Sequence, residues 1–189
     1  GVIADPRYQT IKKTRIIASP RHQQIVRLDH ENHGRIGEPT LAKVRAVLTR
    51  VASRCDALVI SDYGKGVVHE ELLAAAAELA LRKRMVCVVD PKKENYGRYR
   101  HASLVTPNKD EASEAAGIAI RDERSLRAAG RKLLRMWRAE AVMITRGPDG
   151  VSLFRAGNGV RHFPTEPRDI FDVTGAGDTV VAVCALGLA

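Results

Sequence analysis

Short apolar runs alternate with segments of helical periodicity along most of the chain. Four runs have the length of buried strands and end abruptly in polar residues, at 57–61, 85–89, 103–106 and 141–145. Apolar side chains recur at helical spacing over 41–51, 70–83 and 125–138. This alternation predicts βαβ units, and therefore an α/β fold whose mostly parallel sheet is covered by helices on both faces.

The two ends of the chain and one turn add further expected elements. Residues 14–17 and 24–28 alternate in the way typical of a half-exposed strand pair. A strand is expected at 151–154, because the Gly- and Asp-containing turn before it indicates a hairpin. A last helix opens at Gly175 and runs into Leu188. Neither a repeat nor a linker divides the chain, so one domain is expected.

Polar residues follow the predicted strands at the point where each strand ends. Asp62, Asp90, Asn108 and Thr145 hold these positions. Ligands of parallel sheets bind at the carboxyl ends of the strands, so we expect these side chains at one edge, around a site.

Composition bounds the class of protein. The chain has 189 residues, of which 44% are hydrophobic, and it contains no apolar run near the roughly 20 residues that a membrane span needs. Cys55, Cys87 and Cys184 show no paired spacing, so we expect neither disulfides nor a zinc site, and a cytoplasmic location. The chain begins at Gly1 without Met and stops inside an apolar helix, so we expect a piece of a longer protein.

The net charge of +9 is regional. Residues 1–54 hold 11 Lys and Arg against 4 Asp and Glu. Nucleic acid, an anionic small substrate, or acidic neighbours outside this piece would each explain the surplus. Stacking on single-stranded nucleic acid is disfavoured, because Tyr8 is the only aromatic residue in that segment.

The sequence Asp172-Val173-Thr174-Gly175-Ala176-Gly177-Asp178 opens the last helix. The glycines allow a tight turn, and the free N–H groups of a helix start favour an anion. Asp178 either caps the helix or accepts a proton from an attacking hydroxyl while the N–H groups stabilise a transferring phosphoryl group. The chain lacks both the P-loop pattern and the third glycine of a Rossmann fingerprint.

Asn108-Lys109-Asp110-Glu111 follows a predicted strand and opens a helix. Asn108 and Glu111 have the spacing of a capping box, which by itself explains the pattern. The alternative is that they organise water, magnesium and nucleotide phosphates. The histidines show no spacing typical of a metal site.

Five motifs together resemble the ribokinase / phosphofructokinase-B family of sugar kinases. They are, in order, Asp62-Tyr63-Gly64-Lys65-Gly66, Asp90-Pro91-Lys92, Asn108-x-x-Glu111, Thr145-Arg146-Gly147-x-x-Gly150 and the Asp172–Asp178 segment. Three looser runs are similar to the heptose 7-phosphate kinase branch, at 21–29, 58–63 and 105–108. The resemblance covers nearly the whole chain.

The resemblance implies a role for each motif. Asp178 would be the base, and the backbone N–H groups of Gly175, Ala176 and Gly177 would form the anion hole. The ATP side would be formed by Asn108, Lys109, Asp110, Glu111, Thr145, Gly147 and Gly150, with Glu111 holding Mg²⁺ through water. Asp62, Lys65 and Lys92 would lie on the substrate side, although an exposed lysine after a strand is as often plain surface.

The resemblance also implies a fold. It implies a ribokinase-like three-layer α/β/α sandwich with a doubly wound sheet, incomplete at both ends. Residues 1–35 would supply substrate-side strands, and 36–189 the nucleotide-binding core.

The resemblance implies a reaction and partners as well. The expected reaction is ATP-dependent phosphorylation of D-glycero-β-D-manno-heptose 7-phosphate at its anomeric hydroxyl, with phosphorylation of another sugar by a carbohydrate kinase of the family as the alternative. Expected partners are ATP, Mg²⁺ and a sugar phosphate, with a second copy of the chain as a further candidate; neither nucleic acid nor membrane is expected. These 189 residues alone are expected to be inactive and poorly stable, because a sheet edge would be unpaired.

Overall fold

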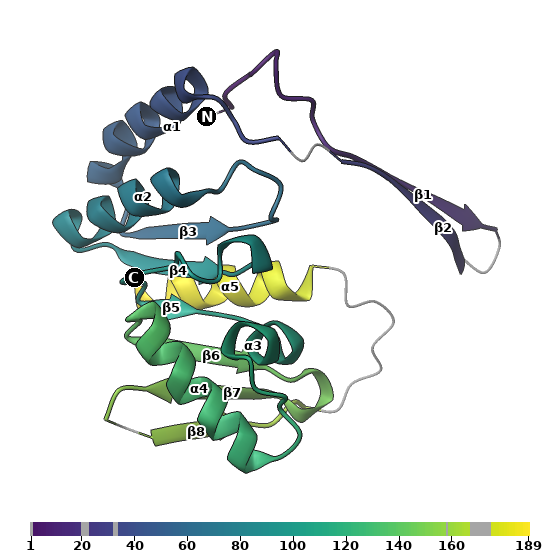
Figure 1. The fold of residues 1–189 in the computed structure, drawn as a ribbon, viewed down its shortest axis with the longest axis vertical. Helices are drawn as coiled ribbons and strands as arrows, with labels where there is room; N and C mark the ends of the chain where they lie inside the picture. The colour runs from purple at the N-terminus through teal and green to yellow at the C-terminus, as the bar shows by residue number, and fades with distance from the viewer. Residues whose placement is uncertain (1, 20–22, 32–33, 158, 167–174) are drawn as a thin grey trace.

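A computed structural model describes residues 2–19, 23–31, 34–157, 159–166 and 175–189. Its centre is a six-stranded sheet whose strands follow one another in chain order (Figure 1). The strands are β3 (Ala57–Ser61), β4 (Val86–Asp90), β5 (Leu104–Val105), β6 (Ala141–Thr145), β7 (Val151–Arg155) and β8 (Gly159–Phe163). The pairs from β3 to β6 are parallel, while β7 and β8 pair antiparallel.

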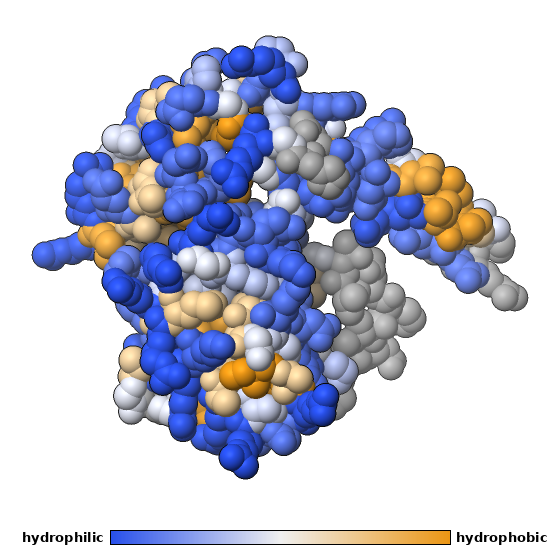
Figure 2. Space-filling model, viewed as in Figure 1, coloured by the Kyte–Doolittle hydropathy of each residue, from blue (hydrophilic) through white to orange (hydrophobic). Residues whose placement is uncertain are grey.

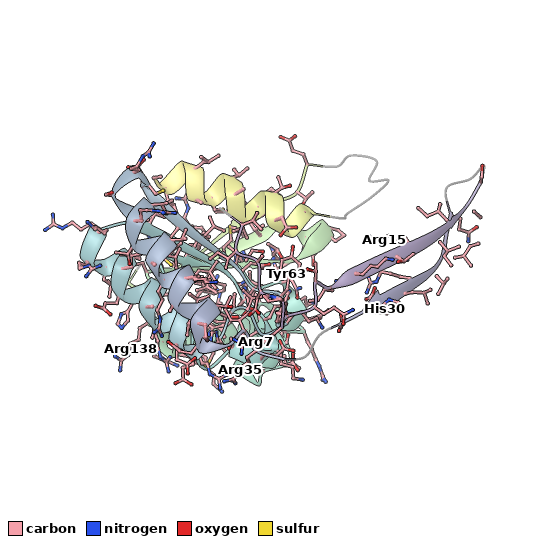
Figure 3. The ribbon with its side chains drawn as sticks, turned by 90° about the horizontal axis from the view of Figure 1, so that it is seen from above. Arg7, Arg15, His30, Arg35, Tyr63 and Arg138 are labelled. Atoms are coloured by element: carbon pink, nitrogen blue, oxygen red, sulfur yellow. The ribbon has the colours of Figure 1, made fainter. Side chains whose placement is uncertain are left out.

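Helices cover both faces of this sheet, which confirms the three-layer expectation. One face carries α2 (Glu70–Lys83), α3 (Lys109–Ala116) and α4 (Glu123–Trp137), and α1 (Glu38–Val51) packs against α2. The opposite face carries α5 (Ala176–Leu188), as the view along the sheet shows (Figure 3). Short 3₁₀ helices lie at Ala52–Arg54, Lys93–Asn95 and Gly147–Asp149.

Alternate residues of β4 divide the core between the two faces, as strand geometry requires. Cys87 and Val89 belong to the larger cluster, with the buried faces of α2, α3 and α4. Val88 belongs to the smaller cluster, with Val181 and Ala185 of α5. The apolar stripes of α2 and α4 are buried in the larger cluster, and that of α1 packs in a third, small cluster around Leu41, which confirms the three helices predicted from their apolar period.

The N-terminal segment forms a separate arm. Strands β1 (Lys12–Ala18) and β2 (Gln23–His30) pair antiparallel and project from the body as a two-stranded sheet (Figure 1). Nearly all of their side chains are exposed or half-exposed. The predicted strand pair is therefore confirmed, and it stands outside the core.

Most predicted elements agree with the structure, and the differences have local causes. Helix α4 begins two residues earlier than its apolar period, because Asp122 caps it by accepting the Ser125 N–H at 2.8 Å. Strand β8 was not predicted, since it is exposed at every residue but Val160 and includes Arg161 and His162. In the described part of the chain, no helix is long and apolar enough to cross a membrane.

Candidate active site

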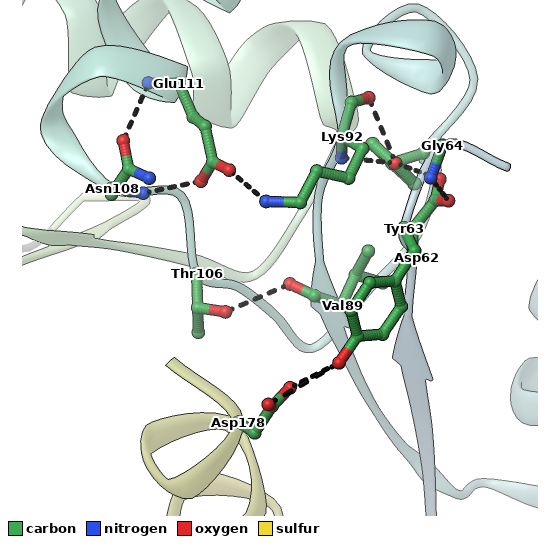
Figure 4. Close-up of polar contacts among 10 residues, drawn as sticks. Asp62, Tyr63, Gly64, Val89, Lys92, Thr106, Asn108, Glu111 and Asp178 are labelled. Carbon is green, nitrogen blue, oxygen red and sulfur yellow. Dashed lines mark hydrogen bonds and ion pairs between the residues drawn. The ribbon is translucent and has the colours of Figure 1, made fainter. Parts of the chain in front are cut away.

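The polar residues that end the strands meet at one edge of the sheet, as predicted. The Asp62 N–H donates to the Asp90 carbonyl at 3.2 Å, which joins the ends of β3 and β4. The Thr106 hydroxyl donates to the Val89 carbonyl at 3.2 Å. Asn108 forms a parallel bridge with Thr145, which brings the start of α3 beside the end of β6. Chain segments far apart in sequence thus form one surface (Figure 4).

Asp62 is a buried carboxylate, only 1% exposed. It accepts hydrogen bonds from the Gly64 N–H at 2.8 Å, Asn95 Nδ2 at 2.7 Å and the Tyr99 hydroxyl at 2.6 Å. Burial, together with this bond to Asp62, raises the pKa of Tyr99 well above its ordinary value. Three donors compensate a charge that would otherwise be costly to bury, so Asp62 fixes the loop that follows β3.

Asn108 and Glu111 form the predicted capping box. Asn108 Oδ1 accepts the Glu111 N–H, and Glu111 Oε2 accepts the Asn108 N–H, both at 2.9 Å. The other oxygen of Glu111 accepts from Lys92 Nζ in an ion pair. Burial works against the ammonium charge, but Glu111, Asp90 and Asp62 together outweigh it and the pKa of Lys92 is raised. The cap explains the Asn–Glu spacing, while the ion pair adds a positive group at the edge.

Asp90 is half-buried between these groups. Burial raises its pKa to about 6; Glu111, Asp178 and Asp62 add to this effect, and Lys92 opposes it. The four acidic groups therefore lie close enough to interact, with one lysine among them. Within the described residues, no three His, Cys, Asp or Glu side chains come together closely enough to hold a metal ion.

Asp178 lies on the exposed first turn of α5. Gly175 begins the helix with φ of +79°, in the left-handed region that favours glycine, and no side chain caps it. Of the two roles that the sequence allows for Asp178, helix cap or proton acceptor, the structure does not show the cap. Its carboxylate instead accepts hydrogen bonds from the Tyr63 hydroxyl, at 3.3 Å to Oδ1 and 3.5 Å to Oδ2 (Figure 4). The predicted residues Asp172, Val173 and Thr174 lie outside the described residues.

The remaining predicted residues of the nucleotide side lie at the same edge. Gly147 and Gly150 flank the turn after β6, where the Arg146 N–H donates to the Gly150 carbonyl at 2.8 Å. Lys109 and Asp110 lie exposed in the first turn of α3, and Asp110 lines a shallow hollow with Asn108 and Glu111.

Lys65 lies farther out, at the foot of the arm. Its Nζ pairs with Glu31 Oε2 at 2.5 Å, and its carbonyl accepts the Tyr8 hydroxyl. A cavity of about 630 Å³ opens here between the arm and the end of β3. It is lined by Tyr8, Thr10, Ile11, Lys13, Ser61, Asp62, Tyr63, Lys65, Val67 and Val68.

Sequence reasoning did not single out Tyr63, Asn95, Tyr99 or Glu31. Tyr63 could have been found, because it lies inside the Asp62–Gly66 motif. Asn95 ends a short 3₁₀ helix after β4 and Tyr99 lies in the loop that follows, and both segments are too short for a periodic pattern to indicate which way the side chains point.

Comparison with known proteins matches the model of the pfkB family carbohydrate kinases to residues 6–189. The bifunctional protein HldE of Geobacter metallireducens is 48% identical over all 189 residues, and that of Wolinella succinogenes is 42% identical over 188. The chain spans 38% and 39% of the length of these two relatives.

Solved structures share the fold. Phosphofructokinase-2 from Escherichia coli in complex with potassium aligns with a TM-score of 0.78 and 20% identity, over 93% of this chain and 57% of that one. Arabidopsis thaliana ribokinase complexed with ribose and ATP aligns with a TM-score of 0.65 and 16% identity, over 93% of this chain and 55% of that one. This protein chain belongs to the pfkB family of carbohydrate kinases.

Proposed function

We propose that this chain carries the ATP-dependent phosphorylation of D-glycero-β-D-manno-heptose 7-phosphate at its anomeric hydroxyl. The product would be the 1,7-bisphosphate, made in the cytoplasm on the route to ADP-heptose and lipopolysaccharide. Identity of 48% to a bifunctional HldE protein across the whole chain supports this substrate. The main structural observation behind the proposal is the position of Asp178, whose exposed carboxylate does not cap its helix and faces the polar edge of the sheet.

In the proposed mechanism Asp178 acts as the general base. The sugar hydroxyl transfers its proton to Asp178 as its oxygen bonds to the γ-phosphorus of ATP, and the bond from that phosphorus to ADP breaks. The N–H groups of Gly175, Ala176 and Gly177 belong to the first helical turn, where no partner exists within the helix. They are placed to stabilise charge on the transferring group.

The opposite side of the site would take the nucleotide. Thr145, Gly147 and Gly150 would border it, with Asn108, Lys109 and Asp110 toward its phosphates. Lys92, which the resemblance assigns to the substrate side, pairs with Glu111 and so brings its positive charge next to these nucleotide-side residues.

These residues would hold Mg²⁺ only through its bound water molecules. Both Glu111 oxygens already accept hydrogen bonds, and Mg²⁺ commonly keeps its waters while bridging nucleotide phosphates. The ion would neutralise phosphate charge when bound, with Glu111 orienting its water.

We also propose that residues 1–35 form the substrate side and join two copies of the chain. Ile16, Ile17, Ile25, Val26 and Leu28 are between 39% and 66% exposed on the arm (Figure 2). A two-stranded sheet has little stability alone, so pairing with the arm of a second copy would bury this surface.

The test uses the full natural gene product, supplied with ATP and one of heptose 7-phosphate, fructose 6-phosphate or ribose. Phosphorylation of heptose 7-phosphate in clear preference is expected, whereas transfer only to fructose 6-phosphate or ribose would make it another kinase of the family. Asp178→Asn should reduce turnover by about a thousandfold or more and leave ATP binding intact. Asp56→Asn, an exposed aspartate at the opposite edge of the sheet, is the matched control. Retained turnover in Asp178→Asn refutes the base.

A further inference from the structure

Tyr63 contacts Asp178 from a different part of the chain. It lies on the loop after β3, near the point where the arm leaves the body (Figure 3). Its hydroxyl reaches both oxygens of Asp178, at 3.3 and 3.5 Å. Tyr63 is 58% exposed, so burial of the residue does not explain its position.

The backbone on both sides of Tyr63 is fixed. Asp62 is buried and accepts the Gly64 N–H, so a tight turn encloses Tyr63. Gly66 has φ of +83°, and a side chain there would collide with the Gly34 carbonyl at the foot of the arm. The Ile36 N–H donates to the Gly66 carbonyl at 3.1 Å. The loop backbone therefore directs Tyr63, which is more exposed than buried, toward Asp178.

Tyr63 also lines the cavity of about 630 Å³ beside the arm. It consequently stands between that cavity and the carboxylate that we propose as the base. A hydroxyl that donates to Asp178 occupies the place that an acceptor hydroxyl needs in order to give up its proton.

We propose that Tyr63 is a positioning residue: it orients the Asp178 carboxylate, and its hydroxyl occupies the acceptor's position beside that carboxylate until the sugar hydroxyl replaces it. This role rests on the proposed kinase function. Without the tyrosine hydroxyl, water can take the acceptor's position. Its oxygen would bond to the γ-phosphorus, its proton would pass to Asp178, and the bond to ADP would break, releasing ADP and inorganic phosphate.

The test compares two variants in the full natural gene product. Tyr63→Phe keeps the ring but removes the hydrogen bond, so kcat for sugar phosphorylation should fall about tenfold with KM for the sugar not raised. Tyr63→Ala removes the ring as well and leaves the acceptor's position open to water, so phosphate release without sugar should rise about tenfold or more relative to transfer. Both rates are measured in the same preparation, with ADP and inorganic phosphate assayed separately.

Asp56→Asn is the control. Asp56 is exposed and lies at the opposite edge of the sheet from Tyr63 and Asp178. Its change should leave the ratio of hydrolysis to transfer unchanged. A merely structural role for Tyr63 would lower both rates together.

The possible results separate the two proposals. An active wild type whose ratio is unchanged in both Tyr63 variants overturns the role of Tyr63 alone. A wild type that phosphorylates no sugar overturns the kinase proposal and this role with it. If Tyr63→Ala does not fold, Tyr63→Phe decides: an unchanged kcat, or a raised KM for the sugar, overturns the inference.

Discussion

Asp90 carries an energetic cost at neutral pH. Burial, with Glu111, Asp178 and Asp62 nearby, raises the pKa of its carboxyl from 3.8 to about 6. Above pH 6 the group is ionised in both the folded and the unfolded protein. Between about pH 4 and 6 the folded protein holds a proton that the unfolded chain has released. The contribution of Asp90 to stability therefore falls as pH rises through this interval.

Asp90→Asn should remove this pH dependence. We expect its melting temperature to exceed that of the wild type by a few degrees at pH 7 and to match it near pH 4. The gain stays well below what full burial would give, because Asp90 is only half-buried. Thermal melts from pH 4 to 8 measure it, with Asp56→Asn as the exposed control. A variant that gains equally at pH 4 and pH 7 would contradict the titration of Asp90.

At the scale of elements, the loop at 62–66 and the two stems of the arm form one unit. Lys65 pairs with Glu31 at 2.5 Å, and both side chains are only about a quarter exposed (25% and 23%). Lys65→Glu should therefore destabilise the protein by roughly 1–3 kcal/mol and lower its activity, because two carboxylates then meet in a half-buried place. The double variant Lys65→Glu with Glu31→Lys should recover most of the loss in denaturant melts.

This charge reversal separates two roles of Lys65. If Lys65 serves only to pair with Glu31 and hold the arm, exchanging the two charges restores both stability and activity. If Lys65 instead binds a substrate phosphate, the double variant recovers its stability but KM for the sugar phosphate stays raised. That second result would return Lys65 to the substrate side, where the family resemblance places it.

Local signals in the sequence predict some elements of this fold correctly, whereas contacts between distant segments have no such signal. The strand at 57–61 and the helix at 70–83 agree with β3 and α2, because buried runs and apolar stripes are local signals. The meeting of Asp62 with Asp90 follows from parallel strands alone. The Tyr63–Asp178 contact joins residues 115 positions apart, and no local period indicates such a pair. Strand β8 is recognised only through its pairing with β7.

At the scale of the whole molecule, the arm has no core of its own. The register pairs Ile16 with Val26 and Thr14 with Leu28, so these residues share one face of the two-stranded sheet. Ile17 points to the other face, since neighbouring residues of a strand alternate and the extra residue of the local bulge, Ile25, lies on the partner strand. Figure 2 shows the apolar surface on the arm, away from the body of the protein.

A dimer formed through that shared face predicts an asymmetric response to charge. Ile16→Lys should dissociate the dimer, because the lysine would be buried opposite apolar side chains without a partner. Ile17→Lys, on the opposite face, should leave the dimer intact, although Ile17 is the more exposed side chain at 52% against 45%. Sedimentation velocity over a range of concentrations measures both. A wild type that sediments as a monomer throughout would refute the dimer, and dissociation by Ile17→Lys alone would move the interface to the other face of the arm.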